Sequence, residues 1–250
     1  MVRIQLSAQQ WSKIEASLRS ERRAGRPAYD DRKFVEAVLW WRRTGVPWRD
    51  LPPDFGPWKT VFNRFDRWSR TGKWQRLLVA LQTDRDDEWH SLDSTINRAH
   101  QHASGGKGGA AAQGIGRSRG GMSTKVHLVV DALGLPLIFE ITEGQRHDSQ
   151  PAKGLLSKAA SRCLLAEKAY DSDDLRNALI AQECSPVIPS KASRAQRLPY
   201  DRELYKARSE IECTFNLLKQ ARRFATRYEK TLRNYAAVVA LGCALLWLRV

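Results

Sequence analysis

The order of strands and helices expected after residue 88 constrains the fold of this 250-residue chain more than any other feature. Short apolar or β-branched segments alternate there with longer segments in which apolar residues recur at helical spacing. A turn signal at 131–134 separates two strand segments and predicts a hairpin. Strands that alternate with helices indicate a mixed α/β sheet with helices packed on it. The expected strands are 88–93, 125–130, 135–141, 163–166 and 186–188, and helices are expected at 149–160, from Ser172 onwards and around Glu212.

Three acidic residues fall at positions where such a fold concentrates chemistry. Asp93 and Glu167 end two of the expected strands, and Glu212 lies on a late helix. Side chains at the carboxyl ends of strands in an α/β sheet meet at one edge of that sheet. We therefore expect the two strand-end acids to converge on the helical acid, a layout that resembles the RNase H-like fold.

The helix around Glu212 has a polar face beside an apolar stripe. Each residue advances a helix by about 100°, which places Tyr205, Arg208, Glu212 and Lys219 on a common face. Glu212 is then expected at the edge of a buried seam with a cation on either side, where a carboxylate with a chemical role is often found. The alternative is an amphipathic helix with solvated charges. The apolar stripe consists of Leu204, Ala207, Ile211, Phe215 and Leu218.

Residues 1–85 are predicted to form a small all-helical domain ahead of an α/β domain at 86–250. Helices are expected at 7–20, 30–45, 57–72 and 74–81, bounded by capping and helix-breaking residues. The second and third resemble a helix-turn-helix, in which a basic exposed face contacts DNA. A plain helical subdomain with solvated charges is the alternative. The outward-facing basic residues of the third helix are expected to be Lys59, Arg64, Arg67 and Arg70.

The charge balance favours a polyanionic partner. The chain has 42 basic and 27 acidic residues, a formal net charge of +15, and nucleic acid is the commonest partner of such a protein. Its four cysteines contain no C-x-x-C pair, which favours reduced thiols in a cytosolic protein over a zinc site. The apolar run at 236–248 is shorter than the roughly 20 residues that span a bilayer, so we expect a buried helix.

Three polar segments leave their roles open. Residues 104–121 are rich in Gly, Ala and basic residues without apolar periodicity, which predicts a flexible loop. His100 and His102 are either metal ligands or a surface pair. No Cys or third His completes a set of metal ligands with them, which favours the surface pair. The last segment, with Glu143, His147 and Asp148, forms either a turn with a helix cap or a phosphate contact.

Eight short words of the sequence follow one another in a recognisable order. They are L-D-S-T at 92–95, R-A-H-Q-H-A at 98–103, G-R-S-R-G-G at 116–121, T-K-V-H at 124–127, V-D-A-L-G at 130–134, G-Q-R-H-D at 144–148, K-A-Y-D-S-D at 168–173 and Y-x-x-R-x-x-x-E-x-x-x-x-x-x-K at 205–219. In this order they resemble the bacterial insertion-sequence transposases of the IS5 type, within the DDE superfamily. The N-terminal segment, with G-V-P-W-R-D-L-P and F-G-P-W-K-T-V, also looks like the DNA-binding region of this family, so the resemblance covers almost the whole chain.

The resemblance implies a transposase that cuts and joins DNA at the terminal inverted repeats of an insertion element. Asp93 matches the first catalytic aspartate and Glu212 the catalytic glutamate, while Tyr205, Arg208 and Lys219 match residues that position DNA ends and support the glutamate. It further implies Mg²⁺, with Mn²⁺ as a substitute, bound by the three carboxylates. Double-stranded DNA at the terminal repeats and target, a homo-oligomer, and a place in the bacterial cytoplasm at the nucleoid are also implied.

The chain departs from the family pattern at the second acid. The family has L-A-D-K-A-Y-D where this sequence has Glu167 in place of the aspartate. Glutamate keeps the charge but moves the carboxylate outward by about 1.5 Å, one C–C bond. Sites of this kind tolerate errors of about 0.5 Å, so we expect reduced activity. Three alternatives stay open: Glu167 coordinates the metal with local adjustment, Asp171 partly replaces it, or the chain is a catalytically impaired copy that only binds DNA.

Overall fold

A seven-stranded mixed sheet forms the centre of the molecule. The computed structural model describes residues 5–19, 30–157 and 161–249. The long strand β1 (Trp89–Ala99) pairs antiparallel with β3 (Gly121–Val130) on one side and parallel with β5 (Cys163–Ala166) on the other. Beyond β5 lies β6 (Ser185–Val187), and β4 (Pro136–Glu143) pairs with β3. Two short strands complete the sheet, β2 (Gly116–Ser118) beside β3 and β7 (Thr226–Arg227) at the end of β1.

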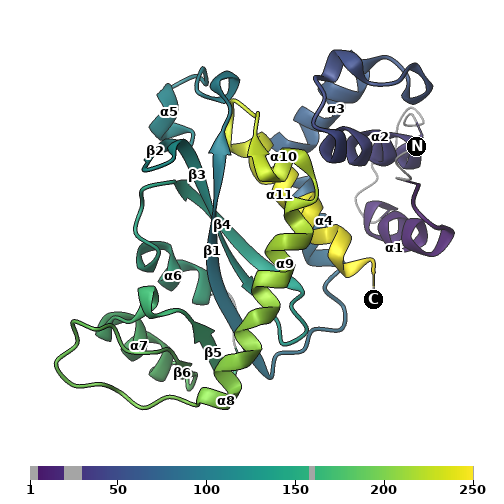
Figure 1. The fold of residues 1–250 in the computed structure, drawn as a ribbon. Coiled ribbons are helices and arrows are strands. Elements are labelled where there is room, and N and C mark those ends of the chain that lie inside the picture. The colour runs from purple at the N-terminus through teal and green to yellow at the C-terminus, as the bar shows by residue number, and fades with distance from the viewer. Residues whose placement is uncertain (1–4, 20–29, 158–160, 250) are drawn as a thin grey trace.

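Helices flank this sheet (Figure 1). In that view α6 (Ser149–Leu156) and α7 (Asp173–Ile180) lie to the left of β1, and α9 (Ser209–Lys219) and α11 (Leu232–Trp247) lie to the right. Residues of β3 are buried in an unbroken run from Ser123 to Val130, as in a strand covered on both faces. The shorter helices are α5 (Gly109–Ala112), α8 (Arg202–Tyr205) and α10 (Arg222–Ala225), and 3₁₀ turns are η3 (Gln101–Ala103), η4 (Lys168–Tyr170) and η5 (Lys206–Arg208).

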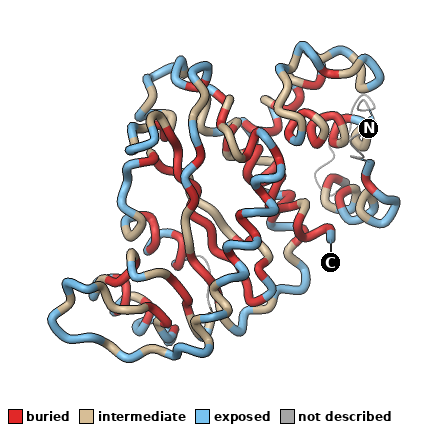
Figure 2. Tube along the Cα trace, viewed as in Figure 1, coloured by how far each residue is buried: buried red, intermediate tan, exposed pale blue. Residues whose placement is uncertain are grey.

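The N-terminal helices pack on the C-terminal helix and share its core. They are α1 (Ala8–Arg19), α2 (Asp31–Thr44), α3 (Trp58–Arg70) and α4 (Lys73–Ala80), with 3₁₀ turns η1 (Trp48–Asp50) and η2 (Pro53–Phe55) between α2 and α3. Helix α11 is apolar on nearly all sides, as a helix buried on all sides must be, and packs against α3, α4 and β4. One apolar core therefore runs continuously from Leu6 to Leu248 (Figure 2).

Local signals predicted most of the elements correctly. The hairpin is confirmed by the antiparallel pairing of β3 with β4. The Asp131 carboxylate stabilises its turn by accepting hydrogen bonds from the backbone N–H groups of Leu133 (3.1 Å) and Leu135 (2.8 Å). The α2 cap at Asp30 and the α7 cap at Ser172 are also confirmed. The C-terminal apolar run is a buried helix as expected, and no helix in the described ranges has the length and apolar character to cross a membrane. Residue 20 of the first expected helix and residues 158–160 of the one beginning at Ser149 lie outside the described residues.

Two predictions about secondary structure were wrong. The strand expected to end at Asp93 continues to Ala99, because β3 supplies hydrogen-bonding partners along β1 from Ser91 to Arg98. The segment 104–121, expected to be a loop, contains α5 and β2. Two of its backbone carbonyls are bound by side chains outside the segment. Gly114 accepts a hydrogen bond from Thr124 Oγ1 of β3 at 2.7 Å, and Gln113 accepts one from the distant Arg227 at 2.7 Å.

Candidate active site

Three carboxylates from three separate elements surround the guanidinium group of Arg208. One Arg208 nitrogen lies 3.0 Å from Asp93 Oδ2, and the other lies 3.2 Å from Glu167 Oε1 and also bonds Glu212 Oε1. The Arg208 side chain is only 13% exposed, whereas Glu167 and Glu212 are 46% and 55% exposed. The expected convergence of the three acids is therefore present, with an arginine between them.

The register of the sheet places Asp93 beside Glu167. The parallel ladder of β1 and β5 ends at the pair Leu92 and Ala166, and the next residue on each strand is one of the two acids. There β5 ends and the chain turns into η4, while β1 continues along β3 with Asp93 opposite Leu128. Asp93 is thus positioned inside a strand and not at its end, but it lies at the point where its parallel neighbour ends.

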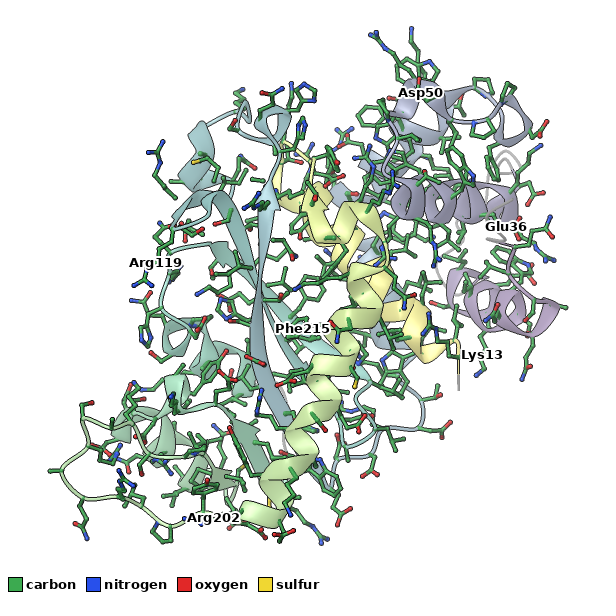
Figure 3. All side chains as sticks on the ribbon, viewed as in Figure 1. Lys13, Glu36, Asp50, Arg119, Arg202 and Phe215 are labelled. Atoms are coloured by element: carbon green, nitrogen blue, oxygen red, sulfur yellow. The ribbon has the colours of Figure 1, made fainter. Side chains whose placement is uncertain are left out.

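Packing of α9 brings the third carboxylate to this point. Ile211, Phe215 and Leu218 are buried, and Phe215 points from α9 toward the sheet (Figure 3). Thr214 Oγ1 donates a 2.6 Å hydrogen bond to the carbonyl of Gly134, which ties the helix to the β3–β4 turn. Glu212 is on the side of the helix next to this buried stripe, as its spacing predicted. The helix is interrupted by η5 at 206–208, so Tyr205 and Glu212 belong to two short helices that follow one another.

The surroundings of Asp93 raise the pKa of its carboxyl group. Burial is the main cause, with a further contribution from the nearby Glu167 carboxylate, and together they raise the pKa of Asp93 to about 6. The Ser94 backbone N–H donates to Asp93 at 2.7 Å and Arg208 attracts it, but neither outweighs burial. For Arg208, burial opposes the charge, yet the pull of Asp93 and Glu167 raises its pKa. A cation is therefore favoured at the centre of this group.

A second polar network lies directly behind Asp93. Ser94 Oγ donates to Asp148 Oδ1 at 2.9 Å, and Lys125 Nζ lies 2.8 Å from the same oxygen. Burial would raise the pKa of Asp148, but hydrogen bonds from Lys125 and Ser94 lower it. His127 lies 4.0 Å away, and burial lowers its pKa to about 4, so it is neutral near pH 7. The sequence placed Asp148 in a polar cluster of unknown role, and missed Ser94 and Lys125 although both lie inside the recognised words.

Asp171, the alternative second acid, is held in a separate network of ion pairs, and its role as a metal ligand stays a prediction. Its carboxylate is 1% exposed and bonds Arg176 at 2.8 Å and Arg194 at 2.9 Å, and the Lys191 backbone N–H at 2.8 Å. Burial alone would raise the pKa of Asp171, but hydrogen bonds from Arg194, Lys191 and Arg176 lower it to about 2. It is a structural anion that joins η4, α7 and the loop after β6.

Arg64 is also a structural residue, so the prediction that it faces outward was wrong. It is buried, pairs with Asp31 at the start of α2, and lies over the rings of Phe34 and Trp68, 4.3 and 5.1 Å from their centroids. Lys59 and Arg67 are exposed on the same helix as expected. The connection between α2 and α3 spans residues 45–57 and includes two 3₁₀ turns, so it is longer than the tight turn of a helix-turn-helix.

The remaining candidate residues lie outside the group formed by Asp93, Glu167 and Glu212 around Arg208, which we call the carboxylate cluster. Tyr205 is half-buried, with its ring 5.5 Å from that of Tyr200 and 5.8 Å from the Arg208 guanidinium. Lys219 is exposed at the far end of α9. The rings of His100 and His102 lie 4.6 Å apart beyond the end of β1.

The donor set fits a hard divalent cation. Carboxylate oxygens are the ligands that Mg²⁺ and Mn²⁺ prefer, and three of them already surround one positive group. Throughout the described ranges, no three His, Cys, Asp or Glu side chains are close enough together to hold a metal ion as they stand. Arg208 supplies the positive charge in this conformation.

Comparison with known proteins covers nearly the whole chain. Residues 6–78 match a family model described as "Putative transposase of IS4/5 family", and residues 90–247 match one described as "Transposase DDE domain". A protein of Brucella ovis named "Putative transposase for insertion sequence element IS6501" is 45% identical over 132 residues, which are 51% of this chain and 100% of that protein. One of Burkholderia cepacia, named "Putative transposase for insertion sequence element IS402", is 30% identical over 135 residues, 49% of this chain and 62% of that protein.

A solved structure supports the fold. A piggyBac transposase in a synaptic complex with hairpin DNA matches 98% of this chain and 72% of its own chain, with a TM-score of 0.55 and 10% sequence identity. At that identity the likeness concerns the fold alone. Together with the mixed sheet and the helical N-terminal region, it confirms the expected RNase H-like α/β fold preceded by helices.

Proposed function

This chain belongs to the DDE-domain transposase family, and from that premise we propose that Asp93, Glu167 and Glu212 form the centre at which it cuts and joins DNA. It is a DNA transposase of an insertion sequence, an enzyme that depends on divalent metal ions. The observation that carries the assignment of the site is the meeting of three carboxylates, from β1, the end of β5 and α9, around Arg208.

These carboxylates would hold the metal, for which we propose Mg²⁺ with Mn²⁺ as a substitute. Divalent ions in such a site activate the attacking oxygen and neutralise charge that develops on the phosphate. Asp93 is fixed by the Ser94 backbone N–H, and Ser94 in turn bonds Asp148, so its carboxylate is oriented from behind. Arg208 balances the negative charge of the three carboxylates in this structure, and we propose that bound metal ions would take over this role and leave its guanidinium group available to a DNA phosphate.

Glu167 is the proposed second acid of this chain. It follows β5 directly, at the position where the family pattern has aspartate, and its carboxylate already bonds the same arginine as the other two. Its 46% exposure leaves the longer side chain room to adjust. Family membership favours an enzyme over the impaired copy, so we propose that Glu167 binds metal and supports cleavage.

DNA contacts are proposed for the exposed basic residues and for the tyrosine beside the cluster. Lys59 and Arg67 project from α3, and Tyr205 and Lys219 lie on either side of the carboxylates along α8 and α9. Cations of this kind neutralise phosphates, the part of DNA affinity that does not depend on sequence. We assign DNA contact to residues 1–85 together with Tyr205 and Lys219 of residues 86–250. We withdraw DNA contact for Arg64, which is buried.

The finer description of the partners follows from the family. We propose that the chain is of the IS5 type and binds the terminal inverted repeats of its element and then target DNA. Two ends must be brought together for joining, so we propose a homo-oligomer. We place its action at the nucleoid in the bacterial cytoplasm.

The experiment that tests this function is metal-dependent cleavage of a labelled duplex carrying the end of the element. We expect the unmodified chain to cut with Mg²⁺ or Mn²⁺, and Glu212→Gln to lose at least about a hundredfold in rate, because charge stabilisation by bound metal contributes several kcal/mol. Glu210→Gln is the matched control, since Glu210 is exposed two residues earlier on the same helix and should leave the rate unchanged.

Glu167→Asp separates the enzyme from the impaired copy. Cleavage by the unmodified chain supports Glu167 as a ligand. Cleavage by Glu167→Asp alone would show that this chain is an impaired copy that binds DNA. If neither protein cuts although both bind the end, our assignment of the second acid is wrong.

A further inference from the structure

A large aromatic cleft lies between the N-terminal helices and the far end of β1. It has a volume of about 1100 Å³ and is separate from the carboxylate cluster. His100 follows the end of β1 directly and is seven positions along the chain from Asp93. At about 3.3 Å per residue, this places the cleft roughly 23 Å from Asp93 along β1. One wall carries Trp48, Trp58 and Phe62, and the other carries His100, His102 and Tyr228.

The aromatic rings on both walls are arranged in groups and are only partly covered. Trp48 stacks on the buried Trp41 at 3.8 Å and has Phe62 at 5.7 Å, while the ring of His100 lies 5.0 Å from that of Tyr228. Trp48, Trp58, Phe62, His100 and Tyr228 are each neither fully buried nor fully exposed. Two groups of rings facing one cleft offer flat, apolar surfaces on which another planar ring can stack.

The charges at this cleft leave an excess of positive charge. Its two acids are already neutralised: Asp66 pairs with Arg233 at 3.0 Å, and Glu229 pairs with Arg223 at 2.8 Å. Arg49 and Lys230 also line it, are exposed, and have no acidic partner within the part of the chain that the structure describes. The cleft therefore combines aromatic walls with two cations available to an anion.

A planar aromatic group attached to an anion matches the rings and the two exposed cations of this cleft together.

We propose that this cleft binds an unpaired nucleobase of the bound DNA, with the adjoining phosphate held by Arg49 and Lys230. The inference rests on the proposed function, because the DNA-bound enzyme supplies the strand. Base stacking on aromatic side chains combined with a basic surface is how proteins hold unpaired strands. Since base pairs are spaced by 3.4 Å, the recognised base lies roughly seven positions from the phosphate that is cut.

The test compares duplexes of the element end that carry either one unpaired adenine or an abasic residue at the same position, moved from four to ten base pairs from the cut. Binding is measured by fluorescence anisotropy in EDTA, so that no cleavage occurs. We expect the adenine to bind between about five- and a hundredfold more tightly than the abasic residue near position seven, the range contributed by one base stacked on an aromatic side chain.

Three variants assign that preference to the cleft. Trp58→Leu and His100→Ala, on opposite walls, should abolish the difference between adenine and abasic DNA, with the affinity for intact duplex retained. Trp89→Leu is the control, because Trp89 is a half-buried tryptophan at the start of β1, outside the cleft. Thermal unfolding confirms that each variant is folded. Loss of the preference for adenine in one folded cleft variant is enough to assign the preference to the cleft.

The outcomes separate this inference from the proposed function. A chain that binds and cuts the intact end but shows no preference for adenine at any position overturns the cleft proposal alone. If Trp58→Leu and His100→Ala both keep the preference for adenine, the cleft proposal is also overturned and the proposed function is unaffected. A chain that neither binds nor cuts the end overturns the proposed function, and this inference with it.

Discussion

At the scale of single residues, Arg208 explains how three acids can share a small space. Carboxylates gathered on one side of the sheet would repel each other, and one guanidinium group bonded to all three removes that cost. Its planar set of donors can serve several oxygens at once, which a lysine ammonium cannot do in the same geometry. Spacing on the helix predicted that Arg208 would be near Glu212, but not that it would reach Asp93 and Glu167.

Asp171→Asn is predicted to destabilise the protein without removing a metal ligand. The lowered pKa of Asp171, about 2 against 3.8 in the unfolded chain, means that its stabilisation is present above pH 4 and is lost as the pH falls toward 2. At pH 7 we expect a loss of about 2 to 4 kcal/mol, because two arginines lose a buried partner. Urea unfolding between pH 3 and pH 7 measures the difference in free energy of unfolding between the unmodified chain and Asp171→Asn. This difference should become smaller below pH 4.

The control for this prediction is Asp173→Asn. Asp173 is 75% exposed and also pairs with Arg194, so its removal should cost less than about 1 kcal/mol. Equal losses for the two variants, or a loss of metal-dependent cleavage by folded Asp171→Asn, would contradict the structural role of Asp171.

At the scale of elements, helix ends are positioned by close packing against other helices. Gly45 ends α2 with a φ of 78°, in the left-handed region that favours glycine. A Cβ at this position would come within 2.9 Å of the Cβ of Arg222 on α10, so α2 and α10 approach each other through the missing side chain. This contact joins an N-terminal helix to the segment that follows α9.

Gly45→Ala should therefore cost more stability than Gly72→Ala. Both glycines have a positive φ, but a Cβ on Gly72 would come no closer than 3.5 Å to any atom, the end of the Arg76 side chain. We expect a loss of about 1 kcal/mol for Gly72→Ala from the backbone alone, and of about 2 to 4 kcal/mol for Gly45→Ala, in which the clash is added. Denaturant unfolding measures the free energy of unfolding of both variants. Equal losses would show that α2 and α10 can move apart to accommodate the new side chain at little cost.

At the scale of the whole molecule, the N-terminal helices and the sheet are held together by α11. The division of the chain at residues 85 and 86 remains a prediction, but the apolar core crosses it without interruption. Val238 and Leu241 of α11 are at most 1% exposed, and α11 packs against both α4 and β4. The helices that precede the sheet in sequence thus cover a helix that follows it.

A core substitution in the N-terminal helices should consequently destabilise the sheet. Trp74 on α4 is fully buried, and Trp74→Ala is expected to cost about 3 to 5 kcal/mol. Amide hydrogen exchange of β1 and β3 should accelerate together with that of α3 and α4, since one cooperative unit unfolds as a whole. Leu133→Ala, at a side chain that is 58% exposed, is the control with little expected effect. Unchanged exchange in the sheet would establish two independent domains.

Local physical chemistry was sufficient for the parts of this protein whose cause lies within a few residues. The Asp131 turn, the Ser172 cap, the strand directly before Glu167 and the helical face of Glu212 follow from neighbours along the chain. Together with the recognised words, these features were enough to identify the fold and the transposase family, and they are the basis on which we propose the three acids.

Tertiary structure decided the features whose partners lie far away in sequence. The length of β1 depends on β3, and the burial of Arg64 depends on Asp31 and Phe34 of another helix. The regular structure within residues 104–121 depends on Arg227. Its guanidinium group donates a hydrogen bond to the carbonyl of Gln113, which is 114 positions earlier in the chain. Hydrogen bonds and ion pairs form by proximity in space, and periodicity along a sequence reports only the neighbours within a few turns or along one strand.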